Sequence, residues 1–351
     1  MATIPEFIEN NIIGREIAHD ARLNSTEIGE LWNTYMSFSM YTCVYKHFLS
    51  NVQDKDIRSV LQFAMDIANK RVTWVMETFN KEGLPIPIGF TDEDVNIKAP
   101  RLYSDPFYLH YIKNKTNVGI VIEGLALTSS TRPDVREFYA HCCSSTTQLY
   151  QRTADLLLSK GIYIRPPYIT TIKTTDTVKK QNFLAGYLVD KRRPLLATEI
   201  SSLFQGITSY SFGKGILISF RQVARSKQVR DYMERGIDLA NSFVNMFTPI
   251  LSQEDIPIPM DWDTFVTDST VPPFSDKLMM GKSLYMSAAG IVNCGTAIST
   301  NLRHDLLPGY TRTMTNVGNY AEDSVNIMIE NGWLEEPPRV VDRKNLINAK
   351  Q

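Results

Sequence analysis

The sequence has few of the features that mark several large classes of protein. It contains only four cysteines in 351 residues, and Cys43, Cys142, Cys143 and Cys294 are too scattered for a disulfide framework, so we expect reduced thiols. No stretch approaches the ~20 consecutive apolar residues of a membrane span. The N-terminal MATIPEFIENN lacks the basic region and apolar core of a signal peptide. These absences predict a cytoplasmic protein without a membrane span.

Charge of one sign is not in excess either. The 37 Lys and Arg residues balance 38 Asp and Glu residues, which gives a net charge of -1. Such a balance argues against bulk electrostatic attraction to nucleic acid, and we expect no nucleic-acid partner. Hydrophobic residues make up 43% and charged residues 21% of the chain, a composition typical of packed globular proteins.

An internal repeat organises the chain. The string Thr-Glu-Ile at residues 26–28 recurs at residues 198–200, and Pro-Ile-Pro at 85–87 recurs at 257–259. Further matches follow at nearly the same offset, among them Gly161 with Gly332. Self-similarity at a fixed offset over this length indicates duplication of a whole domain.

Each repeat has the hydrophobic periodicity of four long helices. Between Ile57 and Phe79, apolar residues recur every three to four positions, over a length that is too great for a strand. Ser104 and Pro106 are typical of a helix start, Gly161 is typical of a helix end, and Thr26 and Thr198 suit N-caps. Later helices are predicted near residues 198–225, 227–252, 276–301 and 306–331.

The lengths of the connections predict the topology. Short links join the first helix to the second and the third to the fourth, whereas segments near 83–104 and 254–275 join the second to the third. Two antiparallel hairpins with one long crossover are the ferritin-like connectivity. We therefore predict two tandem ferritin-like four-helix bundles, at residues 1–161 and 198–351. The linker at 162–197 carries apolar residues that we expect to dock on a domain, namely Phe183, Leu184, Tyr187 and Leu188.

Several strings resemble a known bacterial family. They are IPIGFTDEDVN, APRLYSD, LLSKGIYIRPPYI, VTDSTVPPFSDKLMM and IMIENGWLEEPP. They are similar to the family known as domain of unknown function 3231, and the resemblance covers about residues 20–345. It implies tandem ferritin-like bundles, similar in their single halves to spore-coat-F-like proteins of bacilli. It implies a spore or forespore context but no established activity.

The ligand pattern of a ferritin-like metal site is absent from the sequence. Such a site needs a Glu from each of two helices and a Glu-x-x-His pair from each of the other two. The sequence has a single such pair, Glu16 and His19, which precedes the first predicted helix, so the two required pairs are not present. Residual candidates are Glu123, Glu137 and His141. We expect Glu123, which lies in an apolar stretch, to pair with a Lys or Tyr instead. The sequence therefore predicts no metal, no other cofactor and no catalytic residue.

Three functions remain open at this point. The first is a non-catalytic structural or interaction role, related to spores or stress, with an unknown protein partner or self-association. The second is a metal-dependent, di-iron-like redox enzyme. The third is a carrier of a small hydrophobic ligand, for which Met279, Met280 and Met286 could line a pocket.

Overall fold

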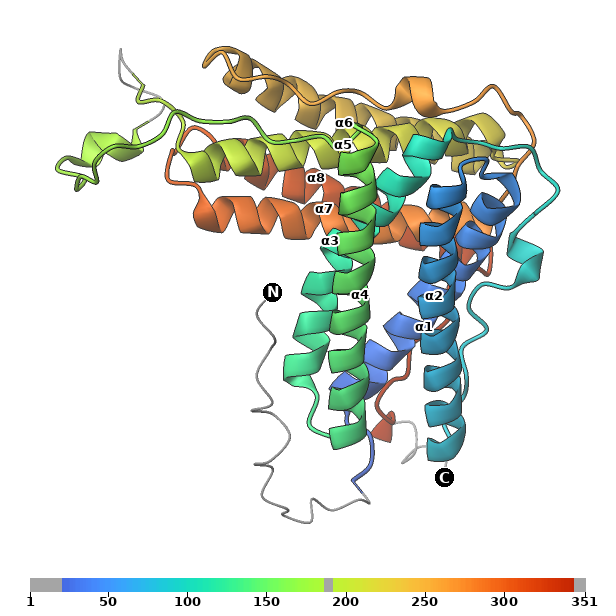
Figure 1. The fold of residues 1–351 in the computed structure, drawn as a ribbon. Helices are drawn as coiled ribbons and strands as arrows, with labels where there is room; N and C mark the ends of the chain where they lie inside the picture. The colour runs from blue at the N-terminus through green and yellow to red at the C-terminus, as the bar shows by residue number, and fades with distance from the viewer. Residues whose placement is uncertain (1–20, 186–191, 344–351) are drawn as a thin grey trace.

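The computed structural model describes residues 21–185 and 192–343, whose long elements are eight α-helices (Figure 1). We call the first four helices the first unit and the last four the second unit. The first unit contains α1 (Ser25–Asn51), α2 (Lys55–Glu82), α3 (Asp105–Ser129) and α4 (Pro133–Ser159). The second unit contains α5 (Ala197–Val223), α6 (Lys227–Ser252), α7 (Asp276–Thr300) and α8 (Leu307–Glu330).

The predicted all-helical class is confirmed. In the described ranges the structure has no β-strand, and its other elements are the short 3-10 helices η1 (Asp92–Asp94), η2 (Gln181–Leu184) and η3 (Asp263–Phe265). Each unit has short links within its two hairpins and a long connection between its second and third helices. None of the helices in the described ranges has the length and apolarity to cross a membrane.

Helix ends follow local chemistry. Ser104 is the N-cap of α3, with Pro106 in the first turn, and Gly161 follows α4 with φ of 70°. The predicted N-cap at Thr26 is wrong, because Asn24 caps α1. Its side chain accepts from the Glu27 amide and the Glu27 carboxylate accepts from the Asn24 amide, a reciprocal pair that moves the helix start two residues earlier.

In each unit, one buried carboxylate, Glu27 or Glu199, accepts hydrogen bonds from the backbone of the link between the last two helices. Glu27 has no exposed surface and accepts from the backbone N–H groups of Thr131 and Arg132, each at 2.8 Å, in the link between α3 and α4. Glu199, also fully buried, accepts from the backbone N–H of Arg303 at 2.9 Å. Each carboxylate thereby joins the start of one hairpin to the turn of the other, which explains why both repeats keep it.

The two long connections meet in a pseudo-symmetric contact between the units. Antiparallel bridges pair Val95 with Phe274 and Tyr103 with Val266. Val95 is the repeat equivalent of Val266, and Tyr103 is that of Phe274, so each unit offers the same pair of positions to the other. The backbone hydrogen bonds obey the same exchange: Asn96 N to Pro273 O (2.8 Å), Thr267 N to Leu102 O (3.0 Å), Ser104 N to Phe265 O (3.0 Å) and Ser275 N to Asp94 O (3.0 Å).

Aromatic side chains from both units pack together, so that the hydrophobic core is continuous between the units. The ring of Phe107 in α3 stacks on that of Phe212 in α5, with centroids 4.6 Å apart. Trp262, from the second long connection, contacts both rings edge-on and is 1% exposed. Figure 1 shows the helices of the two units running crosswise, with α3 reaching the second unit at this junction.

The segment after α4 begins against the first unit and contacts the second unit near η2. The Ile162 carbonyl is hydrogen-bonded to His110 Nε2 at 3.0 Å. Farther along, the Leu184 carbonyl accepts from the backbone N–H of His304 at 3.0 Å, and the Arg193 guanidinium lies over the Phe183 ring. Phe183 and Leu184 therefore approach the second unit as expected. Tyr187 and Leu188 lie outside the described residues.

Candidate ligand-binding cavity between the units

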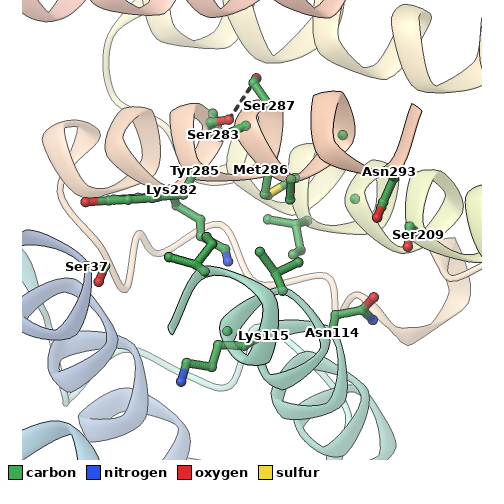
Figure 2. Close-up of a pocket in the computed structure, with 18 of the residues that line it drawn as sticks. Ser37, Asn114, Lys115, Ser209, Lys282, Ser283, Tyr285, Met286, Ser287 and Asn293 are labelled. Atoms are coloured by element: carbon green, nitrogen blue, oxygen red, sulfur yellow. Dashed lines mark hydrogen bonds between the residues drawn. The ribbon is translucent and has the colours of Figure 1, made fainter. Parts of the chain in front are cut away.

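A cavity of about 420 Å³ lies where the two units meet, within the range of about 300–1,000 Å³ typical of small-molecule sites. Helices α1 and α3 of the first unit and α5 and α7 of the second supply most of its walls. Figure 2 shows α7 facing α3 across this space, with Lys282 and Met286 on the α7 side and Lys115 and Asn114 on the α3 side. Most lining side chains are apolar or aromatic.

Lys282 places a primary amine in this apolar space. The residue is 7% exposed, and its Nζ lies 4.6 Å from the ring centroid of Tyr111 and 5.2 Å from that of Tyr41. No described carboxylate lies within 4.0 Å of that nitrogen. Burial, together with the nearby ammonium of Lys115, lowers the pKa of Lys282 to about 7.

Lys115 supplies a second amine from α3. It is also 7% exposed, and its Nζ lies 4.4 Å from the ring centroid of Phe38 and 5.6 Å from that of Tyr41. Burial, together with Arg71, lowers the pKa of Lys115 to about 8, although Glu123 opposes the shift. The Tyr41 ring is thus shared by both amines. One turn along α3 is Gly119, where an added Cβ would lie 3.7 Å from Nζ, in ordinary van der Waals contact with the amine.

An ion pair closes the inner end of the cavity. Glu123 Oε1 accepts from an Arg71 guanidinium nitrogen and, at 2.9 Å, from the hydroxyl of Thr146. Arg71 also donates to the Cys142 carbonyl at 2.7 Å. The expectation that Glu123 pairs with a Lys or Tyr is wrong, because the α2 guanidinium reaches it first with a charge-assisted hydrogen bond. This carboxylate is therefore already neutralised by Arg71.

Polar atoms near the cavity remain without partners among the described residues. The Tyr111 hydroxyl is buried and has no hydrogen bond, and the same holds for Glu123 Oε2. Ser283 and Ser287, on the α7 wall, instead donate to the backbone carbonyls of Met279 and Ser283 within their own helix (Figure 2). Buried polar atoms without a partner destabilise the folded state, so these positions favour a further group in the cavity.

The second unit has no equivalent of the charged cluster. Phe243 occupies the repeat position of Arg71, and Cys294 that of Glu123. Phe243 stacks on Tyr210 with centroids 3.9 Å apart, and the Tyr210 hydroxyl lies 3.6 Å from the Cys294 sulfur. The charged cavity wall therefore belongs to the first unit and to Lys282 of the second.

The three residual metal candidates are not brought together. Glu123 is buried beside Arg71, whereas Glu137 and His141 are exposed on α4. In residues 21–185 and 192–343, no three His, Cys, Asp or Glu side chains are close enough to hold a metal ion. Around Glu123 the available partners are a guanidinium and hydroxyl groups, which are donors to a carboxylate and not a ligand set for iron.

The sequence reasoning missed the lysines of the cavity. Lys282 is the one charged residue in the stretch MMGKSLYMSAAG, which was an available signal, whereas Lys115 follows Lys113 in YIKNKTNVGIVIE and does not stand out there. Of the methionines expected to line a pocket, Met286 lines the cavity, whereas Met279 and Met280 are fully buried in the core.

The fold and cavity define an all-helical protein of two similar units with an apolar site between them. The model of the family described as "Protein of unknown function (DUF3231)" matches residues 12–174 and again 185–346, so the chain belongs to that family and contains it twice. No curated protein matches the chain.

A solved structure from Bacillus halodurans C-125, described as a "putative spore coat protein", is similar to part of the chain. The two are 20% identical, and the match covers 43% of this chain and 98% of the other, with a TM-score of 0.39.

Proposed function

We propose that this chain is a non-catalytic binding protein that carries a small hydrophobic molecule in the cavity between its units. The observation behind the proposal is the cavity itself, which has a suitable volume, mostly apolar walls and a few polar groups at one end. Those walls come from helices of both units, so the tandem arrangement and not either unit alone creates the site.

Each unit, in this proposal, is a ferritin-like bundle, with residues 1–161 and 198–351 as the two domains and 162–197 as the linker. The long connection between the second and third helices of each unit supports this assignment. The metal chemistry of such bundles does not fit the residues present, because Arg71 neutralises the one buried acid of the cavity. We accordingly expect no tightly held iron and favour carriage over the redox alternative.

The biological context rests on the family resemblance. We propose a spore- or stress-related role, in the cytoplasm, spore or forespore, in which the carrier has either a protein partner or a second copy of itself as its neighbour. The name of the solved structure from Bacillus halodurans is compatible with that context.

The test is the binding of a neutral apolar fluorophore, N-phenyl-1-naphthylamine, to the full chain. We expect saturable binding of one molecule per chain. Ala289, which lines the cavity, is changed to Trp to fill it, and the exposed Ala140 on α4 is changed to Trp as the control. The proposal predicts an at least tenfold loss of affinity for Ala289→Trp only. Non-saturable binding, or equal binding by both variants, would contradict it.

A further inference from the structure

The two cavity lysines lack the counter-ion that buried ammonium groups require. Buried charges in proteins are normally paired, because leaving water without a partner is strongly unfavourable. Lys115 and Lys282 each have aromatic rings as their near neighbours, and neither has an ion pair within the described part of the chain. Contact with the face of a ring stabilises a cation only modestly.

The positive charges near the two lysines exceed the negative charges, so the cavity can accept an anion. Arg71 pairs with Glu123. Glu30 also lines the cavity, where burial raises its pKa, and it has no ion pair with either lysine. The phenols beside the lysines are those of Tyr41, Tyr111 and Tyr285. Burial raises the pKa of each of these phenols, so they stay uncharged at neutral pH and cannot act as counter-ions. With both amines protonated, the cavity has an uncompensated positive charge.

Resting on the proposed function, we infer that the carried molecule is an aliphatic or aromatic carboxylic acid, whose carboxylate lies between the amines of Lys115 and Lys282. Both amines lie near the Tyr41 ring, at 5.6 Å and 5.2 Å from its centroid, one from each unit. The unpartnered hydroxyl of Tyr111, beside Lys282, offers a third donor. The apolar body of the ligand then contacts the walls around Met286 and Phe212.

A carboxylate accounts for the observations better than other head groups. An alcohol would leave both ammonium groups without a counter-ion, and an amine would add a like charge. A carboxylate has two acceptor oxygens and no donor, which matches the two amines and the Tyr111 hydroxyl as donors. Hydrogen bonds between charged groups are the strong ones in such a setting.

The experiment measures displacement of N-phenyl-1-naphthylamine from the full chain at pH 6.5. The competitors are decanoate, decan-1-ol and decylamine, which share one chain length and differ in the head group. We expect decanoate to bind about 10- to 100-fold more tightly than decan-1-ol, as charge-assisted hydrogen bonds imply. Decylamine is expected to bind more weakly than decan-1-ol.

Lys282→Met and Lys115→Met keep the aliphatic stems and remove the charges, and Lys81→Met, at an exposed position on α2, is the control. Each cavity variant should lose most of the preference for decanoate while retaining decan-1-ol, and the control should retain both. If the fluorophore binds but decanoate and decan-1-ol bind equally, or the preference survives both substitutions, the carboxylate assignment is wrong and the carrier proposal stands. If the fluorophore does not bind, both are wrong.

Discussion

Lys115 and Lys282 destabilise the folded state when the cavity has no anion in it. An amine that is 7% exposed has lost most of its hydration, and the lowered pKa values report that loss. Residues that weaken the fold at a binding site are typical of proteins in which affinity and stability oppose each other. This opposition can be measured in the ligand-free protein.

Lys282→Met should stabilise the ligand-free chain at pH 6 by about 1–4 kcal/mol, the range seen when buried charges give way to apolar side chains. The pKa of Lys282 is about 7 in the folded state, against an ordinary lysine pKa of 10.5 in the unfolded chain. The unfolded chain therefore binds more protons between these values, so the penalty of the wild-type lysine is full below pH 7 and decreases toward pH 10.5. Urea unfolding at pH 6 and pH 9.5 tests this, with Lys81→Met as the control. A destabilised Lys282→Met protein at pH 6 would refute it.

The affinity for decanoate should fall as the pH rises above about 7. Decanoate requires the protonated amines, and the pKa values of Lys282 and Lys115 in the free protein are about 7 and about 8. The expected loss approaches tenfold per pH unit for each lysine above its pKa. Titration calorimetry between pH 6 and pH 9 measures the slope, and decan-1-ol, whose affinity should stay constant, is the control. A flat profile for decanoate would contradict the assignment.

Among the elements, the helices themselves and the N-cap at Ser104 could be predicted from the sequence, whereas the N-cap of α1 could not. The signals that predict the helices depend only on the sequence around each helix, as the hydrophobic periodicity, Pro106 and Gly161 show. The cap of α1 depends on Glu27, which also accepts backbone N–H groups from the α3–α4 link. That second role exists only in the folded unit. It fixes the helix start at Asn24 instead of Thr26.

Glu27→Ala and Glu199→Ala should each destabilise the protein by about 2–4 kcal/mol, because each substitution leaves buried backbone N–H groups without an acceptor. Both carboxylates have a lowered pKa, to which several donors contribute against the effect of burial. Glu77→Ala, at an exposed position on α2, should change the free energy of unfolding by less than about 0.5 kcal/mol. Denaturant unfolding at pH 7 measures all three. Equal stability of Glu27→Ala and Glu77→Ala would show that the hydrogen bonds to the Glu27 carboxylate contribute nothing to the free energy of unfolding.

In the whole molecule, the two units behave as one because they share a core and a backbone contact. Phe107, Phe212 and Trp262 come from three different segments, and the bridges at Val95 and Tyr103 join the long connections. This packing also creates the cavity. The site could therefore not be predicted from the sequence, because it exists only where the two units pack together. Lys115 and Lys282 belong to different repeats, and only the crosswise arrangement of the units brings them to one aromatic ring.

Thermal unfolding of the wild-type chain should therefore show a single transition by circular dichroism and by tryptophan fluorescence. Trp262→Ala removes the ring that contacts both units and should cost about 3–5 kcal/mol of stability. We expect this variant to separate the unfolding of the two units into distinct transitions. Trp74→Ala, at a position within the first unit, is the comparison. Two transitions in the wild-type protein would show that the units are independent.

The most direct test of the central claim is a crystal structure of the full chain with 10-bromodecanoic acid, in which anomalous scattering locates the bromine. The account predicts the carboxylate within hydrogen-bond distance of the amines of Lys115 and Lys282, and the bromine among the apolar walls of the cavity. A bromine signal confined to the outer surface, or a bound molecule with its carboxylate turned away from both lysines, would contradict it.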